Sequence, residues 1–307
     1  MTVPAAGLIA SEFSIGHTQS LLPLTLYTLG LAIGPLFIAP FSEVVGRRWV
    51  YIFTITSLLI FTAAAGVAPT FSALLAFRFL AGFLGSAGMA IGGGSVADLW
   101  SLQKAGGTIG PFFILCPFLG PILGPIAGTY LIEGHGNDWR WTQWIVLITG
   151  APLWIGAILT EETSKAWITT HKFASEKPVT TSMTAIAQVS IAKIKLAIFR
   201  SAKLLLTDIV CFSLTLYTAY AYALTFSYFA SVPYVFRKYY HFTPAQSSLT
   251  FISIAIGYFL AICMFMTIDR TVYARQVRAV EGELPPPEHR LYAALVGSVF
   301  LPIGLFW

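Results

Sequence analysis

Residues 105–132 read AGGTIGPFFILCPFLGPILGPIAGTYLI and contain no Asp, Glu, Lys, Arg or His. About 20 residues of this kind are enough to cross the hydrocarbon core of a membrane as a helix. Yet the stretch holds four prolines and six glycines, and in water each interior proline costs a helix about 3 kcal/mol and each glycine about 1 kcal/mol. A membrane tolerates such residues where neighbouring helices satisfy the freed backbone groups. The stretch therefore predicts a membrane span that packs against other helices.

The composition extends this prediction to the whole chain. Of the 307 residues, 56% are hydrophobic and only 10% are charged, against roughly 25% charged in ordinary soluble domains. Stretches without Asp, Glu, Lys or Arg recur at span length, at 13–42, 49–77, 79–97, 105–132, 141–160, 209–236, 239–268 and 291–307. We therefore expect an all-α, multi-pass integral membrane protein with about eight transmembrane helices.

Basic residues are distributed unevenly between the two sides of this topology. If the loop with Arg47 and Arg48 is cytoplasmic, 14 of the 18 basic residues lie on that side, three lie opposite and Arg78 lies in a span. This is the positive-inside bias of membrane proteins. Because orientation in a membrane accounts for the basic residues, we expect no nucleic-acid partner. The plasma membrane is the expected location.

The longest polar interval divides the predicted spans into five and three. We expect an N-terminal helical half over 1–160, a cytoplasmic central loop over 161–207 and a C-terminal helical half over 208–307. Within the loop, apolar residues recur at helical spacing beside a basic edge over 183–200. This pattern fits a short amphipathic helix at the membrane surface, and it fits a plain linker equally well.

Charges gather at the predicted cytoplasmic end of the first span. The stretch GPLFIAPFSEVVGRR (34–48) carries Glu43, Arg47 and Arg48, and its Gly46 permits a sharp turn. A functional cluster and an ordinary positive-inside anchor both fit this stretch.

The next informative stretch is LLAFRFLAGFLGSAGMAIGGGSVADLW (74–100). A charge within a span, here Arg78, is costly unless it faces a wet cavity or a polar partner, which makes Arg78 a functional candidate. Snorkelling to the nearby interface is the alternative. Asp98 ends this span on the same side as Glu43 and Arg47, where an ion pair across helices would be weak enough to break, at under about 1 kcal/mol.

Glycines recur at helical spacing in two predicted spans. Those at 82, 85, 88 and 92 would form one smooth side of a helix, for which close packing is the preferred interpretation. In the opening stretch, glycines at 120, 124 and 128 and prolines at 117, 121 and 125 form two parallel ridges, because four-residue steps drift only about 40° around a helix. The glycine ridge predicts close packing, and the proline ridge predicts a bend.

Sequence motifs of enzymes are absent. The chain has no GxxxxGK[ST], HExxH, GxSxG or CxxC pattern, and its three cysteines are isolated. We therefore expect neither an enzyme nor a bound metal or cofactor.

Taken together, these stretches resemble the major facilitator superfamily in its fungal drug:proton antiporter form, the twelve-span multidrug and polyamine exporters. GPLFIAPFSEVVGRR is similar to that family's loop 2–3 motif, RFLAGFLGS (78–86) to its fourth-span motif and LGPILGPIAGTYL (119–131) to its fifth-span antiporter motif. Three further stretches resemble parts of this family: DWRWTQWI (138–145) is similar to the start of the sixth span, LTEET (159–163) to its end, and PPEHRLYAALVGSVFLPIGLFW (286–307) to the ninth span.

The resemblance implies a partial major facilitator fold that carries spans 2 through 9 of twelve and is truncated at both ends. It implies proton-coupled export of small amphipathic or cationic compounds by alternating access. By motif position, Arg78 is implicated in proton coupling, and Glu43, Arg47 and Asp98 would form a cytoplasmic charge latch. The implied antiporter hinge comprises Gly120, Pro121, Gly124, Pro125 and Gly128.

Three tyrosines of the predicted seventh span, Tyr217, Tyr220 and Tyr222, are candidate substrate-lining residues, because aromatic faces attract cations. An interfacial or packing role is the preferred interpretation for them. The expected partners are a small-molecule substrate, protons and the lipid bilayer, with the chain a monomer. Two other hypotheses stay open: an inactive fragment of such a transporter, from a truncated gene model or a pseudogene, and a membrane interaction or sensor protein that uses the 161–207 loop.

Overall fold

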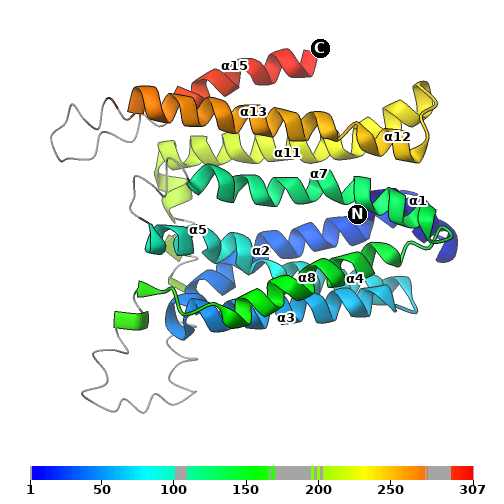
Figure 1. Cartoon of the computed structure of the whole chain (residues 1–307), viewed down its shortest axis with the longest axis horizontal. Coiled ribbons are helices and arrows are strands. Elements are labelled where there is room, and N and C mark those ends of the chain that lie inside the picture. Colours follow the sequence, from blue (N-terminus) through cyan, green and yellow to red (C-terminus); the bar gives the residue numbers. More distant parts are fainter. Residues whose placement is uncertain are drawn as a thin grey trace, which may run out of the picture.

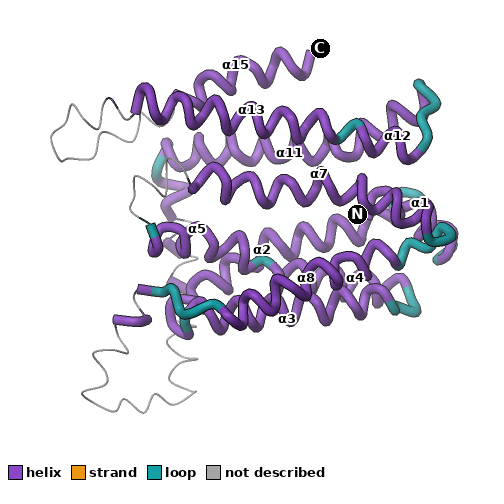
Figure 2. The backbone as a smooth tube through the Cα atoms, viewed as in Figure 1, coloured by secondary structure: helices purple, strands orange, loops and turns teal. Residues whose placement is uncertain are grey.

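The structure is a computed structural model that describes residues 2–100, 109–165, 167–169, 195–196, 199–200, 203–273, 275 and 292–306. The regular elements of this part of the chain are all helices, and the long ones lie side by side along the molecule (Figures 1 and 2). The amphipathic segment expected at 183–200 falls largely outside the described residues.

The chain begins with a short helix, a single 3₁₀ turn and two long helices. The elements are α1 (Thr2–Glu12), η1 (Gln19–Leu21), α2 (Leu22–Val45) and α3 (Arg47–Gly66). A proline in the first turn of α2 suits that position, because its missing N–H would have no partner within the helix. The helix α2 ends at Gly46, whose φ of 97° is accessible to glycine at no steric cost.

One span is built from two helices, α4 (Phe71–Gly85) and α5 (Ala87–Leu99). The N-terminus of α4 is capped by Thr70, whose hydroxyl accepts a hydrogen bond from the amide of Ala73 at 3.3 Å. Ser86 separates the two helices, and its hydroxyl donates to the carbonyl of Phe83 at 2.9 Å. Together α4 and α5 form a continuous apolar segment over Phe71–Leu99.

The opening stretch of sequence forms a single helix, α7 (Gly110–Gly134). It stays helical through three interior prolines, and the hydroxyl of Thr129 donates to the carbonyl of Pro125 at 2.9 Å. A short loop leads to α8 (Trp141–Leu159), which returns along the bundle.

The C-terminal part comprises α11 (Ile209–Tyr239), α12 (Pro244–Leu249), α13 (Ile252–Ile268), a π-helical turn η3 (Asp269–Tyr273) and α15 (Tyr292–Phe306). The start of α11 is capped by the carboxylate of Asp208, which accepts from two backbone amides. A reciprocal capping box between Thr243 and Gln246 starts α12.

Seven helical segments within the described residues are long and apolar enough to cross a membrane, and an eighth, Tyr292–Gly304, is shorter. They coincide with the eight expected stretches, so the all-α membrane fold is confirmed. The helices are shorter than some of these stretches, as expected where a stretch includes loop residues: 49–77 also contains the uncharged loop after Gly66 and the start of α4 at Phe71.

The closest helix pairing is between α2 and α4. A Cβ added to Gly30 would lie 2.5 Å from the carbonyl oxygen of Phe79, and one on Gly82 would collide with the carbonyl oxygen of Tyr27. Glycine on both helices therefore lets the two backbones approach to a distance that any side chain would prevent.

The expectation of one smooth glycine side over 82–92 is wrong. Gly82 faces α2, Gly85 faces Leu58 of α3 and Gly92 faces Phe113 of α7, while nothing lies within 4 Å of a Cβ on Gly88. Gly82, Gly85 and Gly92 therefore face three different neighbours along α4 and α5.

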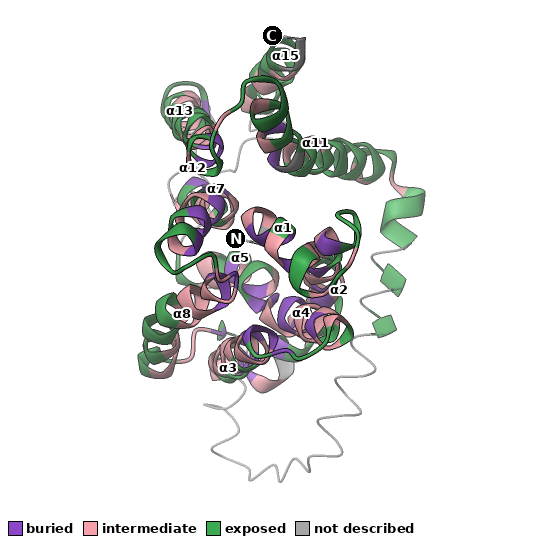
Figure 3. Ribbon diagram, turned by 90° about the vertical axis from the view of Figure 1, so that its right-hand side faces the viewer, coloured by how far each residue is buried: buried purple, intermediate pink, exposed green. Residues whose placement is uncertain are grey.

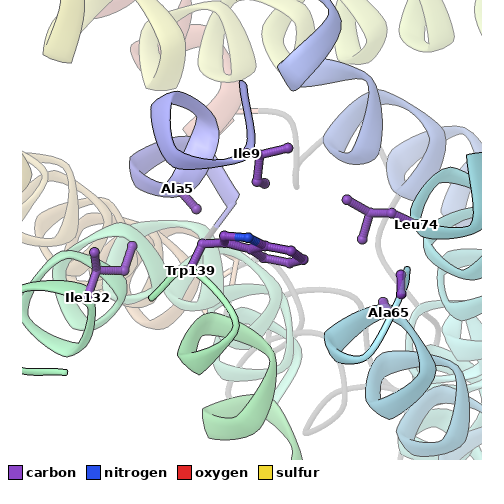
Figure 4. Close-up of a cluster of buried hydrophobic side chains, with 7 residues drawn as sticks. Ala5, Ile9, Ala65, Leu74, Ile132 and Trp139 are labelled. Carbon is purple, nitrogen blue, oxygen red and sulfur yellow. The ribbon is translucent and has the colours of Figure 1, made fainter. Parts of the chain in front are cut away.

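A hydrophobic core lies at the end of the bundle that holds α1. Trp139 is 2% exposed and packs with residues of several helices, namely Ala5, Ile9, Ala65, Ala68, Leu74 and Ile132 (Figure 4). In contrast, α11, α13 and α15 expose most of their surface (Figure 3). Their exposed side chains are mainly apolar, as a surface in contact with lipid requires.

Candidate functional site

The turn between α2 and α3 is closed by an acidic side chain from a distant part of the chain. Oε1 and Oε2 of Glu162 accept hydrogen bonds from the amides of Arg47 and Arg48 at 2.9 and 3.1 Å. Oε1 also accepts from the amides of Thr163 and Ser164, at 3.0 and 2.9 Å. One carboxylate thus caps the N-terminus of α3, where the helix dipole favours a negative charge.

Gly46 provides the space for this contact. A Cβ at this position would lie 2.5 Å from Oε2 of Glu162. The left-handed backbone and the close approach of the carboxylate therefore both require glycine here.

Arg47 joins this turn to the end of α5. Its Nη2 lies 2.9 Å from Oδ2 of Asp98, and the two side chains are 14% and 25% exposed. The guanidinium passes over Gly94, where a Cβ would come within 2.8 Å of Nη2. The guanidinium of Arg48 donates to the carbonyl of Ile158 at the end of α8, at 2.9 Å.

These residues form what we call the basic-end cluster: Arg47, Arg48, Asp98 and Glu162. It lies at the end of the bundle drawn on the left in Figure 1, which the distribution of basic residues predicts to be cytoplasmic. Of the residues expected in a charge latch, the structure brings Arg47 and Asp98 together. Glu43 is exposed and forms no ion pair with any described residue.

Glu162 is a member of this cluster that the sequence motifs do not indicate. Its stretch, LTEET (159–163), resembles only the end of a span. Glu162 follows Arg47 by 115 residues, so no local pattern predicts their contact. The signal that was available is an acidic pair directly after an apolar stretch, on the side already rich in Arg and Lys.

Arg78 lies about two turns into α4, on the part of the helix that packs against α2. Its guanidinium and the Tyr27 side chain of α2 are close enough to interact electrostatically. The structure thus places Arg78 within the packed N-terminal helices, at a distance from the basic-end cluster.

The residues proposed as a hinge occupy different environments along α7. Gly120 is exposed and Pro121 is half-buried, while Gly124, Pro125 and Gly128 are buried. The ridge therefore packs at one end only.

Aromatic rings connect α7 with the C-terminal helices. Phe118 of α7 lies 5.4 Å from the ring of Tyr222 and stacks at 5.0 Å on Tyr258 of α13. Further along, Ile122 of α7 is buried against Phe229 and Phe251. All three candidate substrate-lining tyrosines are exposed on α11, and of these Tyr222 takes part in this aromatic contact.

At the end opposite the basic-end cluster, Glu12 is held by two neighbouring residues. Arg140 donates to both of its oxygens, at 2.6 and 3.1 Å, and Nε1 of Trp139 donates to Oε2 at 2.6 Å. The hydrogen bonds from Arg140 hold the pKa of Glu12 below its usual value, against the opposing effect of burial. The same pairing raises the pKa of Arg140.

A cavity of about 1100 Å³ also lies at this opposite end. One wall is formed by α1, α2 and α7, and the other by α11 and α12. Membrane transporters that are built from two helical halves bind their substrates between these halves, and this cavity lies between helices of the N-terminal and C-terminal parts of the chain.

Comparison with known proteins identifies the class more closely. The chain belongs to the Major Facilitator Superfamily, whose family pattern matches residues 1–307. Its relatives include the efflux pump radE of Floropilus chiversii, which is 31% identical over 100% of this chain and 58% of its own length. Polyamine transporter 4 of Saccharomyces cerevisiae is 31% identical over 97% of this chain and 49% of its own length.

A third relative is named as a probable drug/proton antiporter, YHK8 of Saccharomyces cerevisiae. It is 32% identical over 99% of this chain and 60% of its own length. This chain thus spans about half to three fifths of the length of the relatives described here. The chain is a multi-pass membrane protein of a transporter family, and its relatives are transporters, not enzymes.

Proposed function

We propose that this chain carries out, or forms part of a protein that carries out, proton-coupled export of small amphipathic or cationic compounds by alternating access. The plasma membrane is the proposed location, and the functional unit is a monomer. Three named relatives support the direction and the coupling: an efflux pump, a polyamine transporter and a probable drug/proton antiporter. The proposed halves are 1–160 and 208–307, joined by the loop 161–207.

The observation that carries this proposal is the ion pair between Arg47 and Asp98, with Glu162 at the same turn. The pair links α3 to α5 at one end of the bundle and is partly exposed. Because a partly exposed pair contributes about 1 kcal/mol or less, it can form and break during a transport cycle. This supports a latch role for Arg47 and Asp98, and Glu43 remains a proposed member through its motif position.

Arg78 is the proposed proton-coupling residue. A cation packed within a span is costly, and such a cost is retained where the charge has a function. Gly120, Pro121, Gly124, Pro125 and Gly128 are the proposed hinge, because a span with interior prolines tolerates bending where its neighbours satisfy the backbone.

Transport into sealed vesicles tests the proposal. The purified chain is reconstituted into liposomes with an acidic lumen and a clamped membrane potential, and uptake of radiolabelled tetraphenylphosphonium and 1-naphthoate is measured. We expect uptake of at least one compound that a protonophore abolishes. Passive distribution excludes a weak acid from an acidic lumen, so accumulation of naphthoate would require the protein. The proposal would be contradicted if the uptake of both compounds did not depend on the proton gradient and equalled their uptake into empty liposomes.

Substitution of Arg78 tests its role separately. We expect Arg78→Ala to abolish the stimulation of uptake by the proton gradient and Arg78→Lys to retain part of it, because the lysine keeps the charge. Both variants must elute as monodisperse protein on size-exclusion chromatography. Full stimulation in well-folded Arg78→Ala would remove Arg78 from the coupling mechanism.

A further inference from the structure

The cavity at the end opposite the basic-end cluster has an uneven distribution of charge. Its C-terminal wall carries Arg237 and Lys238, and its N-terminal wall carries Glu133 of α7 and His17. With His17 counted as neutral, two cations against one carboxylate leave one net positive charge. A cleft lined by an excess of one sign attracts ligands of the opposite sign.

The two cations differ in their surroundings. Lys238 donates to the hydroxyl of Tyr234 at 2.7 Å and lies over the Tyr234 and Tyr239 rings, at 5.1 and 5.8 Å from their centroids. Arg237 is exposed and makes no hydrogen bond or ion pair with any residue that the structure describes. Both residues also lie in the last turn of α11, where cations offset the helix dipole. Their charge alone therefore does not define a site.

A second and independent feature is a buried hydroxyl in the wall. Ser247 of α12 lines the cavity and is 2% exposed, and within the described part of the chain its Oγ has no hydrogen-bond partner. Neighbouring hydroxyls are satisfied: that of Ser248 donates to the carbonyl of Ala245 at 2.8 Å, and that of Thr250 donates to the carbonyl of Ser247 at 2.6 Å. A buried polar group that lacks a partner is uncommon in native proteins and requires an explanation. A ligand that accepts a hydrogen bond here supplies one.

The remaining lining is mainly apolar. Leu24 of α2, Pro125 and Ile132 of α7, and Phe251 of the short segment between α12 and α13 contribute to it. The cavity has a volume of about 1100 Å³. Typical small-molecule pockets have volumes of roughly 300 to 1,000 Å³, so the cavity is large enough for such a ligand. An apolar lining with a few polar groups is typical of sites for amphipathic small molecules.

We propose that this cavity binds small organic anions, that is, amphipathic compounds with a carboxylate or another acidic group. The acidic group is attracted to Arg237 and Lys238, a hydrogen-bond acceptor of the ligand meets the hydroxyl of Ser247, and the apolar body packs on the lining. Glu133 on the facing wall repels the acidic group and so orients the ligand towards α11. The inference rests on the proposed function and narrows its amphipathic compounds to acidic ones.

Three ligands of one shape and different charge test this specificity. Binding of 1-naphthoate, 1-naphthalenemethanol and 1-naphthylmethylammonium to the purified chain is measured by equilibrium dialysis at pH 7. The chain is held in phosphatidylcholine nanodiscs, and binding to empty nanodiscs is subtracted. We expect naphthoate to bind about tenfold more tightly than the ammonium compound, which corresponds to about 1.4 kcal/mol.

Variants locate the site. We expect Arg237→Gln to weaken naphthoate binding about five- to tenfold while leaving the alcohol unchanged, because the loss is one of charge. Arg237→Lys should restore most of the affinity. The matched control, Arg270→Gln, removes an exposed cation at the basic end and should have no effect. Ser247→Ala should weaken naphthoate and the alcohol severalfold without lowering thermal stability, since the hydroxyl bonds no described residue.

Equal or tighter binding of the ammonium compound would overturn the inference, as would equal effects of Arg237→Gln and Arg270→Gln. The measurement uses no proton gradient. If naphthoate binds but no compound is transported in vesicles, this inference stands and the proposed function fails. If tetraphenylphosphonium is transported but naphthoate neither binds nor is transported, the proposed function stands and this inference fails.

Discussion

Glu162 shows how a single carboxylate organises the basic end. It accepts from the first amides of α3 and from the two residues that follow it, so it replaces water as the partner of several otherwise unsatisfied donors. This contact between Glu162 and Arg47 is not predictable from the sequence, because the two residues are 115 positions apart and no local pattern links them. The ion pair of Arg47 with Asp98 was accessible from the sequence, because topology places the ends of both spans on one side.

Removal of the Glu162 carboxylate should destabilise the start of α3. We expect Glu162→Ala to lower the free energy of unfolding by about 1 to 2 kcal/mol, the cost of leaving part-buried amide donors without a charged partner. Glu161→Gln is the matched control, since the neighbouring Glu161 is exposed and makes no hydrogen bond with a described residue. The thermal midpoint of the purified protein in detergent measures both. Equal midpoints for the two variants would contradict the capping role.

The pair of Glu12 with Arg140 predicts a pH dependence of stability. Because Arg140 lowers the pKa of Glu12 below 4.5, the pair stabilises the fold above the unfolded-state pKa, and this contribution is lost as the pH falls through the lower folded pKa. Arg140 stays charged throughout this range. Both side chains are about one third exposed, so the contribution is under about 1 kcal/mol.

We therefore expect Glu12→Gln to have a lower thermal midpoint than the unmodified chain at pH 7, and we expect this difference to shrink as the pH is lowered towards 3. Glu133→Gln is the control, because Glu133 is exposed and forms no ion pair with a described residue. A gap between Glu12→Gln and the unmodified chain that stays constant from pH 7 to pH 3 would exclude the ion pair as its cause.

At the scale of the elements, proline and glycine have effects that the local sequence predicts only in part. The prolines of α7 do not interrupt the helix. This agrees with the prediction of one continuous span from the uncharged stretch. The glycines over 82–92 were expected on one smooth side, but Gly82, Gly85 and Gly92 face α2, α3 and α7 in turn. The sequence does not predict this distribution, because it does not show which neighbouring helix each part of the span passes.

The contact of α2 with α4 predicts a large difference between two glycine substitutions. We expect Gly82→Ala to lower stability by about 1 to 3 kcal/mol, because the new Cβ meets the backbone of Tyr27 and the helices must separate. Gly88→Ala should be neutral or stabilising by up to about 1 kcal/mol, since it meets open space and favours the helix. Similar thermal midpoints for the two variants would show that α2 and α4 do not approach as described.

At the scale of the whole molecule, composition predicts most of the fold. Eight uncharged stretches correspond to the observed apolar helices, because charges are rare inside the spans, where Arg78 is the exception that the sequence already singles out. The cavity and its Arg237, Lys238 and Ser247 were not predicted, since they depend on how α11 and α12 face the N-terminal helices. Packing between distant helices leaves little trace in a single sequence.

The pH of the liposome lumen reports whether protons move in exchange for substrate. Liposomes that contain the chain and a trapped pH-sensitive dye are made acidic inside, and 1-naphthoate or tetraphenylphosphonium is added outside at a clamped membrane potential. We expect the lumen to become more alkaline on addition of a transported compound, and we expect Arg78→Ala to abolish this change. Substrate uptake without any change in luminal pH beyond that of empty liposomes would contradict proton-coupled export.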